Sequence, residues 1–346
     1  MWRIANKKIS LGVGFIPSLS YSALLSMIEL MENEGYEQIW CGNEKHYRDM
    51  WVTMGLVSAN TKNLEVGTFI AEPYSYHPSL IAAAIATVFE ATNGRANLLL
   101  GSGGFGFRNL GINRVKPLLA LEESVHLIRQ LLAGEIVSLT GKVIYAKDIQ
   151  LLFDSNPDIP IYIASRGKLI QQMAGRVADG AMLATHATPN GLHESQKSVI
   201  TGCTQSGRDI NDIKIFARID VCIDQNNELA RSTVKPMIAG MILASYPDQT
   251  FITQAGLQLS SEFETILNNT SFNEVYSLAN ELVSDEFVDA FTWAGAPGNV
   301  ANKVAAVIDA GFTNICIVPH APPGISITKI IKDFTTEIMP RVRALL

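Results

Sequence analysis

Short, almost purely apolar runs alternate with longer amphipathic stretches along the whole chain. The short runs are apolar at nearly every position, as in strands of a parallel sheet that are covered on both faces. The longer stretches have the periodicity of helices that bury one side. We predict helices at 21–34, 51–60, 78–92, 118–132, 169–177 and 325–346, and eight strands at 9–16, 37–41, 64–70, 96–100, 159–164, 180–184, 214–223 and 314–318.

Eight strand–helix units predict an α/β fold, a (β/α)8 TIM barrel with insertions. A doubly wound open sheet is the competing architecture, and it usually carries a glycine-rich phosphate-binding turn after its first strand. Here the first predicted strand is followed by residues 15–19 (FIPSL), which contain no glycine. The pattern therefore favours the barrel.

Two segments are longer than an ordinary connection in such a barrel. Residues 134–158 contain an alternating pattern around Ile144 and Tyr145 with a turn at Thr140-Gly141, which predicts an inserted hairpin. Residues 246–295 are mostly helical in pattern and rich in apolar side chains, which predicts an ordered lid. We expect residues 1–346 to form a single barrel domain that carries these two insertions.

Composition and charge narrow the functional class. Charged residues make up 17% of the chain, so a large core is expected. The net charge is -6, from 27 basic and 33 acidic side chains, which argues against binding to nucleic acid or to an anionic membrane. No apolar run reaches the ~18 residues that span a bilayer, and no leader pattern opens the chain, so a cytoplasmic location is expected.

The four cysteines, Cys41, Cys203, Cys222 and Cys316, are far apart and form no C-x-x-C pair. No metal site is therefore predicted. The sequence also contains no P-loop, no G-x-S-x-G and no H-E-x-x-H motif.

Active sites of such barrels lie at the C-terminal ends of the strands. The densest cluster of ionisable side chains, residues 42–47 (GNEKHY), follows the second predicted strand. A histidine there is suited to general acid–base catalysis, and a neighbouring carboxylate can orient it. We predict His46 and Glu44 as catalytic residues; a loop whose charges only face solvent is the alternative.

Two further loops carry candidate binding residues. Residues 101–106 (GSGGFG) match G-x-G-x-x-G but do not open an amphipathic helix, so we interpret them as bare backbone that a planar ligand can approach, or as a tight turn. Ser165, Arg166 and Gly167 run directly into a predicted helix and combine the features of a phosphate site. A serine cap with surface cations is the alternative.

Other polar residues are predicted near the same ends of the strands. Thr185 and His186 follow the sixth predicted strand and His320 follows the eighth. Arg218 and Asp220 lie two apart in the seventh strand and therefore on one face. They are either a buried pair that lines the barrel or a ligand contact.

Two segments carry a family resemblance: residues 93–101 (NGRANLLLG) with Gly103, and residues 159–167 (IPIYIASRG), continued by Ala174-Gly175 and by 178–180. With these segments the chain resembles the bacterial luciferase-like superfamily from about residue 9 onward. That superfamily includes flavin monooxygenases and deazaflavin-dependent reductases.

The resemblance implies roles for several residues. Ser165, Arg166 and Gly167 would meet the cofactor phosphate, and His186 is included among the cofactor-binding candidates. Gly101, Ser102 and Gly103 would line the isoalloxazine ring and the ribityl chain. Relatives often carry a non-proline cis peptide beneath the ring, and the matching bond joins Phe69 and Ile70.

The prediction of the cofactor depends on the positions at which this chain differs from one or the other branch of the superfamily. Residues 66–67, 72–74 and 101–112 look like the methylenetetrahydromethanopterin reductase branch, which uses the deazaflavin coenzyme F420. That branch has Asp-His at the end of strand two, where this chain has Asn43-Glu44. Glu44 and His46 look instead like the Glu-His-His of FMN-dependent monooxygenases, with Lys45 in place of one histidine.

We therefore predict a luciferase-like monooxygenase that uses reduced FMN and dioxygen on a small organic substrate, with a flavin reductase as a partner. A reductase or dehydrogenase that transfers a hydride with F420 is the alternative. A further alternative is a non-catalytic flavin-binding paralogue, because the second histidine is missing and Phe105, Gly106 and Phe107 replace polar groups. The family implies a homodimer, with the apolar helices near Trp51 and Leu80 as candidates for its interface.

Overall fold

The structure is a computed structural model that describes residues 2–104, 106–184, 186–269 and 272–346. It has the α/β fold of a (β/α)8 barrel, as the sequence pattern predicts. Every predicted strand is present with ends that shift by at most a few residues. The eight parallel strands are β2 (Lys7–Phe15), β3 (Gln38–Gly42), β4 (Glu65–Phe69), β5 (Ala96–Leu100), β8 (Ile161–Ser165), β9 (Gly180–Leu183), β10 (Lys214–Ile223) and β12 (Asn314–Pro319).

The chain folds into two compact units. Unit 1 comprises Met1–Val13, Leu183–Gln196 and Phe216–Leu346, and unit 2 comprises Gly14–Met182 and Lys197–Ile215. Each unit is described by itself below. The single domain expected from the sequence stays a prediction.

Unit 2 contains the parallel strand order β9-β8-β5-β4-β3. Its registers pair Gln38 with Glu65, Val66 with Ala96, and Leu98 with Ile161. The strands are buried because apolar side chains occupy both faces, as in β5, where every residue is buried. The helices of this unit are α1 (Tyr21–Asn33), α2 (Met50–Asn60), α3 (Pro78–Ala91), α4 (Pro117–Leu132) and α5 (Lys168–Val177), with short turns η1 (Arg108–Leu110) and η2 (Ile210–Asp212).

Local sequence explains where these helices begin. Ser20 accepts a hydrogen bond from the Ala23 amide at the start of α1, and Asp49 accepts one from the Val52 amide at the start of α2. Pro78 and Pro117 occupy first-turn positions, where the missing N–H has no cost. Helix α6 (Pro189–Ser206) begins in unit 1 and continues into unit 2.

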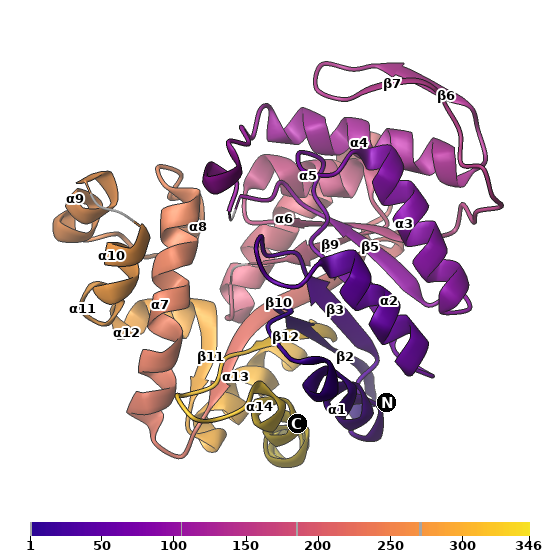
Figure 1. The fold of residues 1–346 in the computed structure, drawn as a ribbon. Coiled ribbons are helices and arrows are strands. Elements are labelled where there is room, and N and C mark those ends of the chain that lie inside the picture. Colours follow the sequence, from indigo (N-terminus) through magenta and orange to yellow (C-terminus); the bar gives the residue numbers. More distant parts are fainter. Residues whose placement is uncertain (1, 105, 185, 270–271) are drawn as a thin grey trace. The chain divides into compact units, whose positions relative to one another are not determined.

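Residues 134–158 contain a two-stranded antiparallel hairpin, β6 (Val137–Thr140) and β7 (Tyr145–Ile149). Figure 1 shows it beside α4. The Glu123 carboxylate on α4 accepts hydrogen bonds from the amides of Lys142, Val143 and Ile144, at 2.7–3.0 Å. These bonds attach the hairpin turn to the helix.

Unit 1 contains the strand order β1-β2-β12-β10, where β1 (Trp2–Ile4) is antiparallel to β2. An additional strand, β11 (Thr292–Gly295), runs parallel to β10. The sequence pattern did not predict β11, which falls at the end of the segment predicted as helical. Trp293 anchors it, because this side chain is fully buried, stacks on Phe334 and donates from Nε1 to the Ala187 carbonyl.

Residues 246–295 form a cluster of short helices against the long helix α7 (Asn227–Ser245), as Figure 1 shows. Phe251, Phe263, Val275 and Val288 are buried in one apolar core with Ile238 of α7. The segment is therefore packed against α7 within unit 1. Its helices are α8 (Thr250–Gln254), α9 (Ser261–Asn269), α10 (Phe272–Ser277), α11 (Ala279–Leu282) and α12 (Asp285–Phe291).

The C-terminal part of unit 1 adds further helices. It comprises α13 (Pro297–Asp309), α14 (Ile327–Asp333), the π-helical turn η3 (Phe334–Ile338) and α15 (Met339–Leu345). Among the described residues, no helix is both long and apolar enough to cross a bilayer.

Candidate functional site

The peptide bond between Phe69 and Ile70, at the end of β4, is cis. This confirms the geometry that the family resemblance implied for this bond. Asn43, just after β3, donates hydrogen bonds to both carbonyl oxygens of this segment. Its backbone nitrogen lies 3.2 Å from the Phe69 oxygen, and its side-chain Nδ2 lies 3.0 Å from the Ile70 oxygen. Gly101 packs against Ile70 so closely that a Cβ there would lie 2.3 Å from Ile70 Cδ1.

A partly buried ion pair lies beside this segment. Lys45 Nζ is 2.8 Å from Glu72 Oε1, and the two side chains are 12% and 2% exposed. Lys45 also donates to Ser75 Oγ at 2.8 Å and to Asn43 Oδ1 at 3.3 Å. The second oxygen of Glu72 accepts from the amides of Tyr74 and Ser75 at 2.7 and 3.0 Å. Asn43 and Lys45 lie in the loop that the sequence analysis singled out, but neither they nor Glu72 and Ser75 were predicted as site residues.

His46 and Glu44, the two residues predicted as catalytic, differ in their exposure to solvent. His46 is exposed, and its backbone φ is 70°, in the left-handed region. Glu44 is half-buried, and its carbonyl accepts a hydrogen bond from the Tyr47 amide. Of the residues in this loop, Asn43 and Lys45 therefore place their side chains in the polar cluster. The catalytic roles of His46 and Glu44 stay predictions.

The glycine loop after β5 follows an irregular path. Gly103 and Gly104 have φ of 61° and 148°, which side-chain-bearing residues rarely adopt. Arg114 Nη1 donates to the Gly103 carbonyl at 3.0 Å. Ser102 is half-buried between Gly101 and Gly103. Phe105 lies outside the described residues.

The loop after β8 leads into the first turn of α5. Ser165 Oγ accepts from the Gly167 amide at 3.0 Å, and Gly167 caps the helix without a side-chain cap. A Cβ at Gly167 would have only Ser165 Oγ near it, at 4.0 Å, so the backbone is open to a ligand there. Arg166 is half-buried and Lys168 is exposed. Free amides at a helix start with two adjacent cations suit a phosphate group.

His186 lies in unit 1 and is only 1% exposed. One ring nitrogen lies 2.9 Å from the Phe251 carbonyl and the other lies 3.1 Å from Ser195 Oγ. Burial lowers the pKa of His186, so a neutral ring donates to the carbonyl and accepts from the hydroxyl. Both nitrogens are thus engaged by the protein, and the ring joins α8 to the start of α6. Thr185 lies outside the described residues.

A second polar cluster lies in unit 1, at the C-terminal ends of β10 and β12. Asp220 is 2% exposed, pairs with Arg218 through both carboxylate oxygens, and lies 2.7 Å from His320 Nε2. Burial alone would raise the pKa of the Asp220 carboxyl, but Arg218 and His320 hold that pKa below its ordinary value. The pair predicted from the strand spacing is therefore a triad that includes His320.

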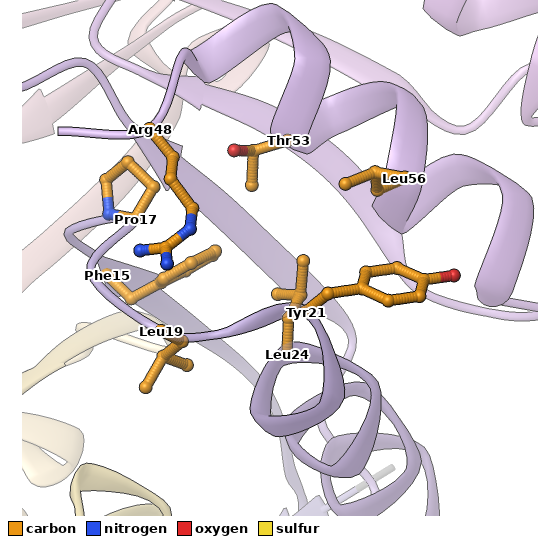
Figure 2. Close-up of a pocket in the computed structure, with 8 residues that line it drawn as sticks. All are labelled: Phe15, Pro17, Leu19, Tyr21, Leu24, Arg48, Thr53 and Leu56. Atoms are coloured by element: carbon orange, nitrogen blue, oxygen red, sulfur yellow. The ribbon is translucent and has the colours of Figure 1, made fainter.

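Figure 2 shows a groove in unit 2 between the start of α1 and α2. Its volume is about 110 Å³, whereas small-molecule sites commonly have about 300–1,000 Å³. Arg48 closes one end by donating to the Ser18 carbonyl at 2.8 Å. The groove is too small for a flavin-sized ligand. Its lining residues are Phe15, Pro17, Leu19, Tyr21, Leu24, Arg48, Thr53 and Leu56.

Among the described residues, no group of three or more His, Cys, Asp or Glu side chains could hold a metal ion. The four cysteines are buried and form no disulfide. Burial raises the pKa of the Cys222 thiol to about 12, so it stays protonated at neutral pH.

The chain is a luciferase-like oxidoreductase, as its family match and its relatives show. The family of luciferase-like monooxygenases matches residues 9–314, and the chain belongs to that family. A 5,10-methylenetetrahydromethanopterin reductase of Methanolobus tindarius is 28% identical over 333 residues, which is 96% of this chain and 100% of the relative.

Two further relatives carry F420 in their names. An F420-dependent glucose-6-phosphate dehydrogenase of Nakamurella multipartita is 26% identical and covers 94% of this chain and 93% of its own length. The solved structure of the coenzyme F420-dependent tetrahydromethanopterin reductase of Methanopyrus kandleri superposes with a TM-score of 0.83 at 22% identity, over 97% of this chain and 100% of that one. The structural likeness shows the shared fold.

Proposed function

We propose that the protein is an F420-dependent oxidoreductase that transfers a hydride between the deazaflavin and a small organic substrate. The observation that carries this proposal is the full-length similarity to proteins named as methylenetetrahydromethanopterin reductase and as F420-dependent dehydrogenase. These relatives support the deazaflavin alternative better than the reduced FMN and dioxygen that the sequence motifs put first.

The residues of unit 2 fit such a cofactor. Ser165, Arg166 and Gly167 would hold a phosphate, because the Gly167 backbone is open and α5 begins there. The backbone of residues 101–103 and the segment Phe69–Ile70 would hold the ring, because they follow the neighbouring strands β5 and β4 and Gly101 packs directly on Ile70. His186 is left out of this set, since its two nitrogens are engaged in unit 1.

When bound, a deazaflavin supplies a hydride and does not activate dioxygen. The chain's own contribution is to orient the ring and to exclude water. A hydride donor of this kind needs no flavin reductase, whereas the reduced FMN of the monooxygenase prediction would.

The cofactor assignment is tested by titrating the purified protein anaerobically with reduced F420 and with reduced FMN, and then admitting dioxygen. We expect F420 to bind at least about tenfold more tightly, about 1.4 kcal/mol. We also expect F420-linked turnover with methylenetetrahydromethanopterin or glucose 6-phosphate. Tighter binding of FMN with a dioxygen-dependent absorbance change would contradict the proposal. Binding of F420 without turnover of any of these substrates would favour the non-catalytic alternative.

The phosphate loop gives a second prediction. Arg166→Ala should weaken binding of F420 about tenfold or more, because a charge-assisted contact is lost. Binding of the chromophore without its phosphate should stay unchanged. Fluorescence titration measures both. Arg176→Ala, at the far end of the same helix, is the control and should leave both affinities unchanged. Equal weakening of the two ligands by Arg166→Ala would remove Arg166 from the phosphate site.

We also propose that the protein forms a homodimer through the exposed apolar face of α2 and its neighbours. Val52 and Leu56 lie one helical turn apart on α2 and are 64% and 37% exposed. Three further large side chains are exposed: Tyr21 of α1 is 51% exposed, Tyr76 is 40% exposed and Leu80 of α3 is 52% exposed. An isologous dimer would bury such a face against its own copy.

Val52→Glu combined with Leu56→Glu should convert the dimer into monomers at micromolar concentration, because four charges would be buried in a twofold interface. Sedimentation velocity measures this change. Leu152→Glu, at a side chain 93% exposed beyond the hairpin, is the matched control and should leave the mass unchanged. A wild-type protein that sediments as a monomer would contradict the dimer.

A further inference from the structure

All three N–H donors of the Lys45 ammonium group have hydrogen-bond acceptors within the protein. Its three N–H donors have three acceptors within 3.3 Å, which belong to Asn43, Glu72 and Ser75. Asn43 in turn donates from Nδ2 to the Ile70 carbonyl. Lys45 therefore fixes the orientation of the Asn43 amide, and through it connects the loop after β3 to the segment after β4.

Both carboxylate oxygens of Glu72 likewise have hydrogen-bond donors within the protein. One oxygen accepts from Lys45 and from the hydroxyl of Ser75, and the other accepts from the amides of Tyr74 and Ser75. A carboxylate that is 2% exposed is stable only with such partners. The ion pair thus defines the path of residues 72–75 as well as the side chain of Asn43.

The glycine loop after β5 packs on the same pair. A Cβ at Gly106 would lie 2.5 Å from Lys45 Cβ, and a Cβ at Gly103 would lie 3.0 Å from Glu72 Cγ. The Lys45 ammonium lies 5.7 Å from the centre of the Phe107 ring, which is buried and meets Tyr74 edge to face. Lys45 and Glu72 therefore contact all three loops that follow β3, β4 and β5.

Two departures from the family pattern are explained by this packing. The position of a histidine is taken by Lys45, and polar groups after Gly104 are replaced by Gly106 and Phe107. These substitutions meet in space, because the lysine stem needs the bare backbone of Gly106 and its ammonium lies near the Phe107 ring. The departures therefore form one packed feature rather than two separate losses of catalytic groups.

We propose that Lys45 is a positioning residue of the cofactor site, which acts through Asn43 and Glu72 to hold these three loops as one preformed surface for the deazaflavin ring. This inference rests on the proposed function. The ion pair also keeps the local charge balanced. Without Lys45, the Glu72 carboxylate would be an uncompensated negative charge near a ring that gains negative charge when it accepts a hydride.

The test measures binding of two probes, F420 and its chromophore without the phosphate, to the full-length protein by fluorescence titration. Lys45→Met should weaken both probes by the same factor, about tenfold or more, because the effect is on the ring. It should also lower the reduction potential of the bound ring, since the remaining carboxylate disfavours the reduced form. Adding Glu72→Gln to Lys45→Met should restore the potential and part of the affinity.

Lys147→Met, at an exposed lysine of β7, is the matched control and should change neither affinity nor potential. If Lys45→Met does not fold, the double variant with Glu72→Gln and the charge-retaining Lys45→Arg give the same comparison. Lys45→Arg should keep the potential but bind both probes more weakly, because a planar guanidinium cannot reproduce the three contacts.

The outcomes separate this inference from the proposed function. A wild-type protein that does not bind F420 contradicts the proposed function. A wild-type protein that binds F420, together with a folded Lys45→Met variant of unchanged affinity and potential, overturns the role of Lys45. A loss of affinity for F420 alone, with the chromophore unaffected, also overturns it, because the effect would then lie on the phosphate.

Discussion

Gly202→Ala is expected to lower the stability of the protein by about 3 kcal/mol or more. At Gly202 a Cβ would lie 1.8 Å from the Gln172 carbonyl oxygen, and at Gly175 it would lie 2.1 Å from the Val199 carbonyl oxygen. Helices α5 and α6 thus meet backbone to backbone, each with a glycine at the contact. Since backbone atoms cannot rotate away, one added methyl must separate the helices.

The same change should affect the candidate cofactor site, because α5 begins at the phosphate loop. Urea denaturation followed by circular dichroism measures the loss of stability, and F420 titration of the folded variant measures its weaker binding. Gly298→Ala is the control, since nothing lies within 4 Å of a Cβ at this exposed position of α13. A Gly202→Ala protein with the wild-type urea midpoint would contradict the close contact of the two helices.

Asp220→Ala should cost about 3–5 kcal/mol of stability, because it leaves the partly buried Arg218 without its bidentate partner. Arg218 is 17% exposed and cannot regain full hydration in place. His320 loses its contact as well. Chemical denaturation at neutral pH measures the cost. The control is Asp309→Ala, at a carboxylate that is 76% exposed and weakly paired, which should change the stability by less than about 0.5 kcal/mol.

The Asp220 carboxylate also predicts a pH dependence. Its folded-state pKa lies below the ordinary value of about 3.9. Its contribution to stability is therefore fully present above about pH 4 and is lost as the pH falls through the lower folded-state pKa. Asp220→Asn removes this titration. The difference in unfolding free energy between wild type and Asp220→Asn should shrink below about pH 4, and a constant difference down to pH 2 would contradict the assignment.

The candidate site could be predicted only in part. The motifs located the loops after β3, β5 and β8, because glycine, serine and charged residues after a buried strand are distinctive. They did not indicate which side chain of residues 44–46 enters the cluster. His46 has a left-handed backbone and is exposed, while its neighbour Lys45 is partly buried and pairs with Glu72. One such backbone torsion decides which side chain faces inward, and residue types alone do not specify it.

The partners of the buried polar residues could not be predicted from the sequence either. His186 resembles a site histidine by its position after a strand, yet its ring is engaged by Ser195 and Phe251. Phe251 lies 65 positions away in the chain. Glu72 and Lys45 are 27 positions apart. No periodicity connects residues at such separations, because each pair is brought together only by the tertiary fold.

By itself, the sequence determined the eight strands and the barrel class, because short, near-continuous apolar runs that alternate with amphipathic stretches are typical of strands buried on both faces of a parallel sheet. It also determined the family resemblance and the loops that carry chemistry. The tertiary structure alone decided that Lys45 pairs with Glu72, that Asp220 joins Arg218 to His320, and that β11 is a strand. Burial follows from local composition, whereas the choice of partner depends on packing between segments that are distant in the chain.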